Sequence, residues 1–336
     1  MSVDTDNFYV IIRLYIPISE RKNFHMQEYV MGNGAIALGA LAAGVNLVAG
    51  YPGTPSSEIL ETISKYRHDG VYIEWSVNEK AAMEVAAAAA YSGARAMVTM
   101  KQVGLNVAAD PLMSLAYVGV KGGMVIVSAD DPGPISSQTE QDTRRFADFC
   151  RIPVFDPSSP EEAYKMIGEA FEYSEKYNTP VLFRPTTRVC HAYASIDNCD
   201  SPSPKKYEGF VKDSKKWVIF PRLSFANHIM IEKRNVEIGK DFSTYSANKA
   251  EGGNSEKAVV TSGISYAYTK ECLKDYPDVK LIKIATAYPF PEDFVLSSLD
   301  GVKEVLCIEE LSPFIEEQIL KLSLIHISEP TRLLSI

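Results

Sequence analysis

Helix-like and strand-like stretches alternate along the chain between residues 33 and 186. Apolar residues recur at helical spacing in 33–45, 55–66, 78–94, 105–119, 139–150 and 159–177. Short apolar stretches, typical of buried strands, lie at 46–53, 71–77, 94–100, 122–130, 153–157 and 180–186. This alternation predicts an α/β fold in which a parallel sheet carries helices on both faces.

The alternation stops over 187–256 and resumes over 258–310 as strand, helix, strand, helix, strand. Between Lys205 and Lys249 there are ten Lys or Arg against five Asp or Glu, a local charge of about +5. This stretch is either a solvated linker that wraps over the first domain or a contact site for an acidic partner. We predict a first domain over 26–190, a linker or wrapping segment over 191–255, and a smaller α/β domain over 256–321.

The two ends of the chain do not follow these patterns. Residues 1–25 have no clear period, and we expect a doubtful extension that comes from a misplaced start codon. Residues 322–336 begin with LSLIHISEPTR, which is the translation of an adapter used in library sequencing. We expect this tail to be an artefact and the natural chain to continue past about Lys321.

Composition and charge exclude several classes of protein. With 336 residues, of which 46% are hydrophobic and 23% charged, the chain should fold around a large core. Its formal charge of -9 argues against nucleic acid as a partner. The longest apolar run, 35–49, is shorter than the about 20 residues that a membrane span needs, and the acidic start is unlike a secretory signal. The five cysteines are scattered without a C-x-x-C pair, which indicates a reducing, cytoplasmic location.

Glu79 is the residue that departs most from core packing. It begins the helix over 78–94, whose residues are small or apolar on nearly all sides, so that helix should be buried. A carboxylate there either complements the helix dipole or has a functional partner. Glu84 lies about 140° further around the helix, so the two do not form an acid/base pair on one face.

The turn GYPGTPSSE (50–58) leads from a strand directly into a helix. Ligands of open parallel sheets bind at such turns, so it is either a ligand loop or a rigid Pro/Gly connector. Ser56 and Ser57 are predicted to cap the helix that follows. The stretch NGAIALGALAAG (33–44) is superficially similar to a dinucleotide fingerprint, but we expect no strand before its helix and therefore no nicotinamide site. Motifs of P-loop NTPases, α/β-hydrolases and zincins are missing.

Three stretches together resemble one family: 50–61, 77–119 and 128–164, which contain GYPGTPSSEILE, VNEKAAMEV, MKQVGLNVAADP and SADDPGPISSQTEQDTR. Over about residues 27–321 the chain is similar to the thiamine-diphosphate-dependent 2-oxoacid:ferredoxin oxidoreductases, and closest to the indolepyruvate ferredoxin oxidoreductase α subunits. The resemblance implies a parallel-sheet, thiamine-diphosphate-binding-like pyrimidine domain followed by a transketolase C-terminal-like domain.

The resemblance also assigns roles to individual residues. Glu79 matches the catalytic glutamate that hydrogen-bonds N1′ of the cofactor's aminopyrimidine. The cofactor-binding residues that it implies are Tyr51, Pro52, Gly53, Thr54, Glu79, Lys101, Gly104 and Asn106. Polar candidates for the substrate entrance are Asp130, Asp131, Gln138 and Arg144.

The reaction that the resemblance implies is oxidative decarboxylation of arylpyruvates such as indolepyruvate. Coenzyme A takes the acyl group, and [4Fe-4S] clusters pass the electrons to ferredoxin. A β subunit completes the enzyme, which is expected to be a homo- or hetero-oligomer. The Mg²⁺ and diphosphate site and the clusters belong to a later domain, so we expect this chain to hold no cluster and to be inactive alone. Two alternatives are a non-catalytic binding module of the same fold and a subunit of a non-oxidative 2-oxoacid decarboxylase.

Overall fold

The computed structural model describes residues 26–322 except 68, 199–202 and 254. Residues 1–25 and 323–336 lie outside the described residues, so the predictions about the two ends of the chain concern residues that the structure does not describe. A six-stranded sheet has the strand order β3-β2-β4-β5-β7-β6, and all its neighbouring strands are parallel. Its strands are β2 (Leu47–Gly50), β3 (Tyr72–Trp75), β4 (Ala96–Lys101), β5 (Met124–Ala129), β6 (Val154–Phe155) and β7 (Val181–Phe183). The predicted parallel sheet is therefore confirmed.

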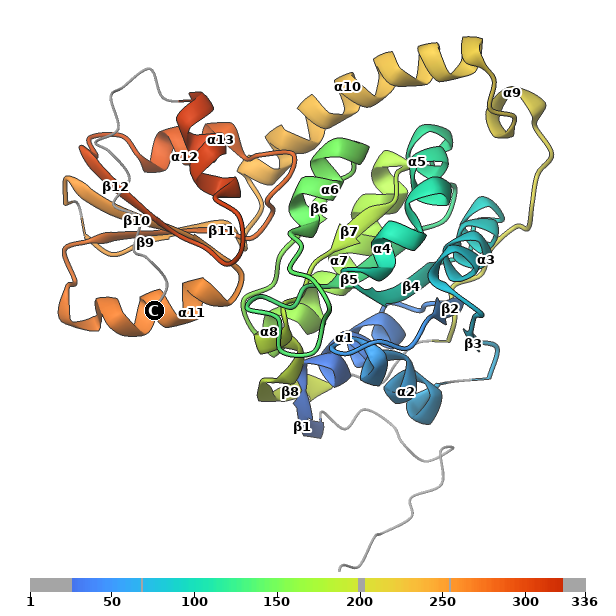
Figure 1. Cartoon of the computed structure of the whole chain (residues 1–336), viewed down its shortest axis with the longest axis horizontal. Coiled ribbons are helices and arrows are strands. Elements are labelled where there is room, and N and C mark those ends of the chain that lie inside the picture. The colour runs from blue at the N-terminus through green and yellow to red at the C-terminus, as the bar shows by residue number, and fades with distance from the viewer. Residues whose placement is uncertain (1–25, 68, 199–202, 254, 323–336) are drawn as a thin grey trace, which may run out of the picture.

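Helices cover both faces of this sheet (Figure 1). One face packs against α1 (Gly32–Ala42), α2 (Ser57–Tyr66) and α7 (Pro160–Tyr177). The other packs against α3 (Glu79–Tyr91), α4 (Gly104–Val107), α5 (Ala109–Val118) and α6 (Thr143–Cys150). Along β5, Val125 belongs to the first core and Ile126 to the second, because successive side chains point to opposite faces. Burial of both faces explains why these strands are apolar throughout.

A second, four-stranded sheet has the order β12-β10-β11-β9, in which only the pair β11–β9 is antiparallel. Its strands are β9 (Lys249–Glu251), β10 (Lys257–Ser262), β11 (Lys280–Ile284) and β12 (Glu304–Ile308). The accompanying helices are α11 (Gly263–Cys272) with a 3₁₀ turn at Leu273–Asp275, α12 (Glu292–Ser298) and α13 (Phe314–Leu322). The order strand, helix, strand, helix, strand that the sequence predicts over 258–310 is confirmed.

Regular elements also occur in the segment between the two sheets, where the sequence shows no rhythm. They are α8 (Thr187–His191), β8 (Tyr193–Asn198), α9 (Ser214–Trp217) and the long α10 (Pro221–Ser243), which runs along the molecule to the second sheet (Figure 1). The buried side of α10 combines apolar residues (Ile231, Ile238 and Phe242) with Asn227 and Asn235, whereas its Phe225 is 72% exposed and its Val236 60% exposed. Because polar and apolar residues occur on both sides of the helix, its period is obscured in the sequence.

A further strand, β1 (Met26–Met31), precedes α1 and pairs antiparallel with β8. The expectation that no strand comes before the 33–44 stretch is therefore wrong. Because β1 lies outside the parallel sheet, it does not create the β-α-β unit that a dinucleotide fingerprint requires.

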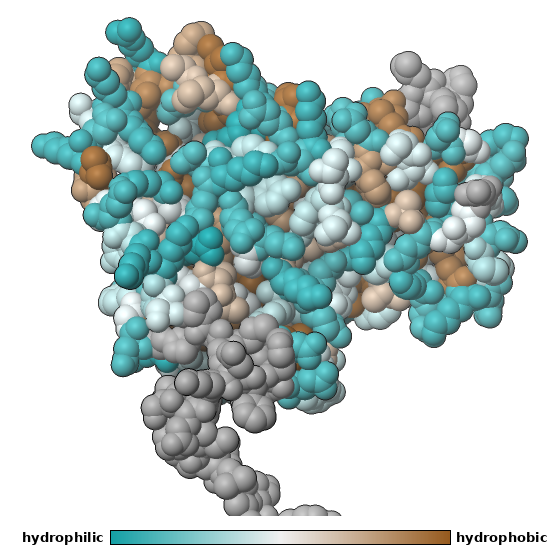
Figure 2. Space-filling view, turned by 180° about the vertical axis from the view of Figure 1, so that it is seen from behind, coloured by the Kyte–Doolittle hydropathy of each residue, from teal (hydrophilic) through white to brown (hydrophobic). Residues whose placement is uncertain are grey.

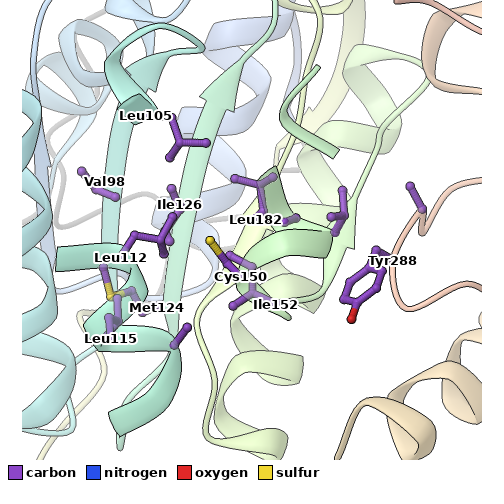
Figure 3. Close-up of a cluster of buried hydrophobic side chains, with 14 of the residues drawn as sticks. Val98, Leu105, Leu112, Leu115, Met124, Ile126, Cys150, Ile152, Leu182 and Tyr288 are labelled. Atoms are coloured by element: carbon purple, nitrogen blue, oxygen red, sulfur yellow. The ribbon is translucent and has the colours of Figure 1, made fainter. Parts of the chain in front are cut away.

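One apolar cluster joins the two sheets. Cys150 and Ile152 from the first part of the chain pack in the same cluster as Val260, Tyr288 and Phe314 from the second, and Figure 3 shows Tyr288 beside Cys150 and Ile152. The rear face of the molecule is mostly hydrophilic, with apolar residues interspersed (Figure 2). Within the described parts of the chain, no helix is both long enough and apolar enough to cross a bilayer.

Candidate functional site

Four loops leave the carboxyl edge of the six-stranded sheet. They follow β2 (51–56), β3 (76–78), β4 (102–103) and β5 (130–142). Because neighbouring parallel strands end at the same edge, these loops converge there, where open α/β sheets bind their ligands. The cofactor-binding residues suggested by the sequence lie on these loops or on the first turn of the helices that follow them, except Lys101, which is the last residue of β4.

Glu79 is the first residue of α3 and is only 8% exposed. Asn78 caps this helix, since its side-chain oxygen accepts a hydrogen bond of 2.9 Å from the backbone N–H of Ala81. Among the residues that the structure describes, none donates a hydrogen bond to the Glu79 carboxylate or forms an ion pair with it. A carboxylate that is held in place and nearly buried without an internal partner is suited to a polar group of a ligand.

Gly104, at the start of α4, brings the backbone directly against this carboxylate. A Cβ atom at Gly104 would lie 2.5 Å from Oε1 and 2.9 Å from Cδ of Glu79, which is closer than van der Waals contact allows. The absence of a side chain at this position therefore sets the location of the Glu79 carboxylate.

Gly104→Ala should displace Glu79 with little loss of stability, because a glutamate side chain can rotate away from the added methyl group. For thiamine diphosphate, the cofactor that the sequence resemblance implies, we expect the dissociation constant in the assembled enzyme to rise at least about tenfold. Gly168→Ala is the matched control, since its Cβ would meet only Ala43 at 3.8 Å. Equal cofactor affinity in both variants would contradict this role of Gly104.

Asn33, a fully buried residue of α1, holds the turn after β2 in place. The Asn33 amide donates hydrogen bonds to the carbonyl of Pro55 at 2.6 Å and to Oε2 of Glu58 at 2.9 Å. Sequence analysis missed both Asn33 and Asn78. A signal existed for Asn78, because asparagine before an apolar helix is a common cap, whereas the contact of Asn33 is purely tertiary.

The two serines of this turn do not cap α2 as the sequence suggests. The Ser56 hydroxyl donates to the carbonyl of Gly53, and the Ser57 hydroxyl accepts from the N–H of Gly53, both at 2.9 Å. Neither hydroxyl reaches the first N–H groups of the helix. These hydrogen bonds close the turn on itself and hold Gly53 in position.

Lys101, the last residue of β4, crosses over Gly53. A Cβ atom at Gly53 would lie 3.0 Å from Cγ and 3.1 Å from Cδ of the lysine. The Lys101 ammonium group donates a hydrogen bond of 3.1 Å to Oε1 of Gln138, which lies on the loop after β5. The structure thus brings together the loops after β2, β4 and β5.

The remaining candidates surround these contacts. Tyr51, Pro52 and Thr54 are exposed residues of the turn that contains Gly53. Asn106 is exposed on α4, one turn beyond the Glu79 contact, and among the described residues no hydrogen bond joins its side chain to the other candidates.

Three of the four residues suggested for the substrate entrance have a different place in the structure. Asp130, Asp131 and Arg144 are buried and hydrogen-bonded within the chain, and only Gln138 is exposed. Asp130 accepts from Arg184 and Thr143. Asp131 accepts from three backbone N–H groups of the loop that carries Gln138. The suggestion that Asp130, Asp131 and Arg144 line an entrance is therefore corrected, because each is bonded inside the fold.

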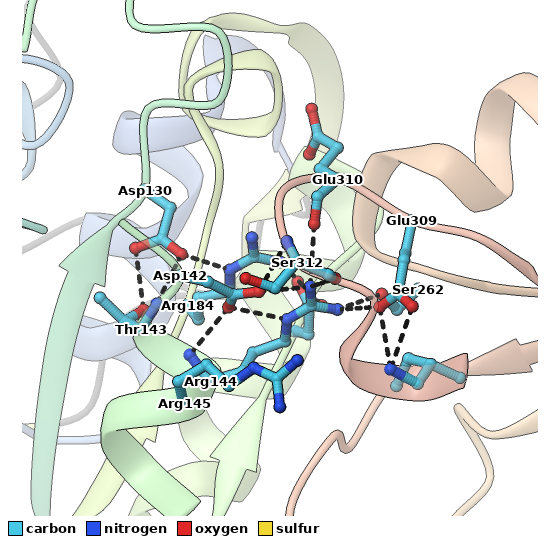
Figure 4. A network of polar contacts seen from close by, with 12 residues as sticks. Asp130, Asp142, Thr143, Arg144, Arg145, Arg184, Ser262, Glu309, Glu310 and Ser312 are labelled. Carbon is cyan, nitrogen blue, oxygen red and sulfur yellow. Dashed lines mark hydrogen bonds and ion pairs between the residues drawn. The ribbon is translucent and has the colours of Figure 1, made fainter. Parts of the chain in front are cut away.

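Arg144 joins the two sheets through a buried polar network (Figure 4). Its guanidinium donates to the carboxylate of Asp142 at 2.7 and 2.9 Å and to that of Glu309 at 2.8 Å. It also donates to the Ser262 hydroxyl and to the carbonyls of Glu310 and Ser312. Residues before 150 are thereby connected to the ends of β10 and β12.

The carboxylates of this network respond differently to burial. Burial raises the pKa of Asp130 to about 6 and also raises the pKa values of Asp156 and Glu309. Burial acts in the same direction on Asp142, but hydrogen bonds from Arg144 lower the pKa of Asp142 overall. Asp142 therefore depends on Arg144 to stay charged.

The described residues of 26–322 contain no cluster of side chains typical of a metal site. No group of three or more His, Cys, Asp or Glu side chains there could hold a metal ion. The donor set of the candidate site is a single carboxylate, an ammonium group and amides, which fits an organic ligand and not a cation.

The fold is that of an open parallel α/β protein, and the candidate ligand site lies at the carboxyl edge of its sheet. The family described as pyruvate flavodoxin/ferredoxin oxidoreductase, thiamine diphosphate-binding, matches residues 38–245. This match covers more than half of the chain, and the chain belongs to that family. The resemblance inferred from the sequence is confirmed.

Within this family, the chain is similar to indolepyruvate oxidoreductase subunits. The chain is 44% identical over 299 residues to indolepyruvate oxidoreductase subunit IorA of Thermococcus kodakarensis, a match that covers 86% of this chain and 46% of the relative. For IorA of Methanothermobacter thermautotrophicus the identity is 41% over 297 residues, covering 87% of this chain and 48% of the relative. The chain thus spans about half the length of these relatives.

Solved structures agree with the fold. The 2-oxoglutarate:ferredoxin oxidoreductase of Magnetococcus marinus matches with a TM-score of 0.73 and 18% identity, over 89% of this chain and 61% of the other. A split-gene transketolase matches with a TM-score of 0.55 and 14% identity, over 86% of this chain and 84% of the other. Both likenesses support the expected pair of α/β domains.

Proposed function

We propose that this chain supplies the aminopyrimidine half of a thiamine diphosphate site in an indolepyruvate:ferredoxin oxidoreductase α subunit. The observation that carries the proposal is the Glu79 carboxylate, which is nearly buried, capped in place by Asn78 and pressed against Gly104. Within the described residues it lacks a hydrogen-bond partner, as a residue that receives a ligand nitrogen would.

Glu79 would hold a proton between its carboxyl oxygen and N1′ of the aminopyrimidine. Gly104 would keep the carboxylate in position, and the turn around Gly53 and Thr54 would line the same cleft. When bound, thiamine diphosphate supplies the stabilisation of negative charge that decarboxylation of a 2-oxoacid requires. We further propose that residues outside this chain hold Mg²⁺ and the diphosphate.

The proposed reaction converts an arylpyruvate such as indolepyruvate and coenzyme A into acyl-CoA and carbon dioxide, and it delivers two electrons to ferredoxin. The names of the IorA relatives support this substrate class. We further propose a β subunit, an oligomeric enzyme and [4Fe-4S] clusters outside this chain. The four described cysteines are all free thiols, which supports a reducing, cytoplasmic location.

We also propose the division of the chain into a pyrimidine domain over 26–190, a wrapping segment over 191–255 and a transketolase C-terminal-like domain over 256–321. The separate strand orders of the two sheets support two domains. Two strands inside the middle segment pair outside it, since β8 (193–198) pairs with β1 and β9 (249–251) pairs with β11. The path of α10, which runs from α9 past α5 of the first domain to α12 beside the second sheet, supports the middle segment (Figure 1).

The test is an assay of the enzyme assembled from the full-length gene product and its partner subunit. We expect arylpyruvate to reduce ferredoxin, or a viologen dye in its place, only when coenzyme A is present. Release of an aldehyde without dye reduction would indicate a non-oxidative decarboxylase. Lack of both turnover and thiamine diphosphate binding would indicate a non-catalytic module.

A further inference from the structure

Three cationic side chains, Lys80, Lys101 and Arg144, lie on or next to the four loops of the carboxyl edge. The ranges considered are 51–58, 76–80, 101–106 and 130–144. Lys80 pairs with Asp110 at 2.9 Å, and Arg144 pairs with Asp142 and Glu309. Lys101 differs from both, because no acidic side chain among the described residues neutralises its ammonium group. Its one hydrogen bond goes to the neutral amide of Gln138.

Lys101 is nevertheless held in place. Its stem passes close over Gly53, where a Cβ atom would lie 3.0 Å from the lysine Cγ, and Gln138 accepts a hydrogen bond of 3.1 Å from its Nζ. The loop that carries Gln138 is itself fixed, because the Asp131 carboxylate accepts from the N–H groups of Ile135, Ser136 and Ser137. A cation that is fixed before the ligand arrives loses less conformational entropy on binding.

The position of Lys101 relates it to Glu79. Gly104, three residues after Lys101, contacts the Glu79 carboxylate, so one short loop connects both charged groups. They are opposite in charge and share an edge of the sheet, yet they do not pair with each other. A ligand between them can therefore meet an acceptor on one side and a cation on the other.

We propose that Lys101 binds the carboxylate of the 2-oxoacid substrate, an inference that rests on the proposed function. An ammonium group has three donors, and Gln138 uses one, so two remain for the substrate carboxylate. Gly53 is then required for a second reason, because any larger residue would push the lysine stem away from the turn. Lys101 orients the substrate, and its assigned partner is the carboxylate alone, not the aryl group.

The experiment compares an acid with its neutral amide in the assembled, cofactor-loaded enzyme. Calorimetry gives the dissociation constants of 3-phenylpropanoate and of 3-phenylpropanamide. In Lys101→Met we expect the acid to bind about 10- to 100-fold more weakly and the amide to bind as before. Lys101→Arg should retain most of the affinity for the acid. Lys80→Met, which removes the same charge from the same edge, should change neither constant more than about twofold.

Two results would overturn the assignment: unchanged affinity of Lys101→Met for the acid, or equal weakening of the acid and the amide. Loss of thiamine diphosphate affinity in Lys101→Met would also overturn it, because the lysine would then act on the cofactor. Failure of the proposed function is recognised separately, since the unmodified enzyme would then show no cofactor binding and no arylpyruvate turnover.

Discussion

Replacement of Glu79 by glutamine should lower turnover of the assembled enzyme at least about 100-fold. Glutamine has the same shape and can still occupy the space against Gly104, but it cannot take up or share a proton with a ring nitrogen. Because the cap by Asn78 and the apolar packing of α3 remain, we expect the melting temperature and the assembly with the partner subunit to stay unchanged.

The matched control is Glu84→Gln, which changes an exposed carboxylate on the same helix. Dye reduction by arylpyruvate and coenzyme A would be measured for both variants. Normal turnover in Glu79→Gln would remove Glu79 from the catalytic machinery. Similar losses in both variants would indicate damage to α3 and not a specific role.

Arg144→Met should have the largest effect on stability. The substitution removes six hydrogen bonds and leaves the carboxylates of Asp142 and Glu309 buried without their cation. Breaking a buried pair in this way costs about 3–5 kcal/mol. We therefore expect the free energy of unfolding, measured in urea, to fall by this amount.

Arg145→Met is the control for that experiment. Arg145 is the next residue, and its salt bridge to Glu317 is partly exposed, so its loss should cost about 1 kcal/mol or less. Equal destabilisation by the two substitutions would contradict the special role of Arg144 in joining the sheets.

Local periodicity was sufficient to predict the strands of the first sheet and three strands of the second, but it missed β9 (Lys249–Glu251), which falls in the predicted linker. Val125 and Ile126 lie on opposite faces of one strand and are both fully buried, so a continuous apolar run marks the strand. The helix α10 could not be found in this way. Phe225 faces outward and Asn235 inward on it, and the partner of Asn235 is the carbonyl of Arg151, 84 positions away.

Contacts between residues far apart in the sequence also limited the prediction of the candidate functional site. Glu79 could be singled out because a carboxylate at the start of a helix made mostly of small and apolar residues is unusual in itself. Arg144 and Asp131 could not be separated from Gln138, since all three belong to one polar stretch of the sequence, SADDPGPISSQTEQDTR. Arg144 donates hydrogen bonds to Ser262 and Glu309, which lie 118 and 165 positions further along the chain. Contacts of that separation leave no trace in local spacing.

The apolar cluster shared by the two sheets has a consequence for exchanging parts between homologous proteins. A chimera joined near residue 255 would combine Cys150 and Ile152 from one parent with Tyr288 and Phe314 from the other, and so would mix two halves of one core. The crossover would also separate Arg144 from its partners at 262 and 309. Viable chimeras should therefore inherit these positions together from a single parent, even though they are far apart in the gene.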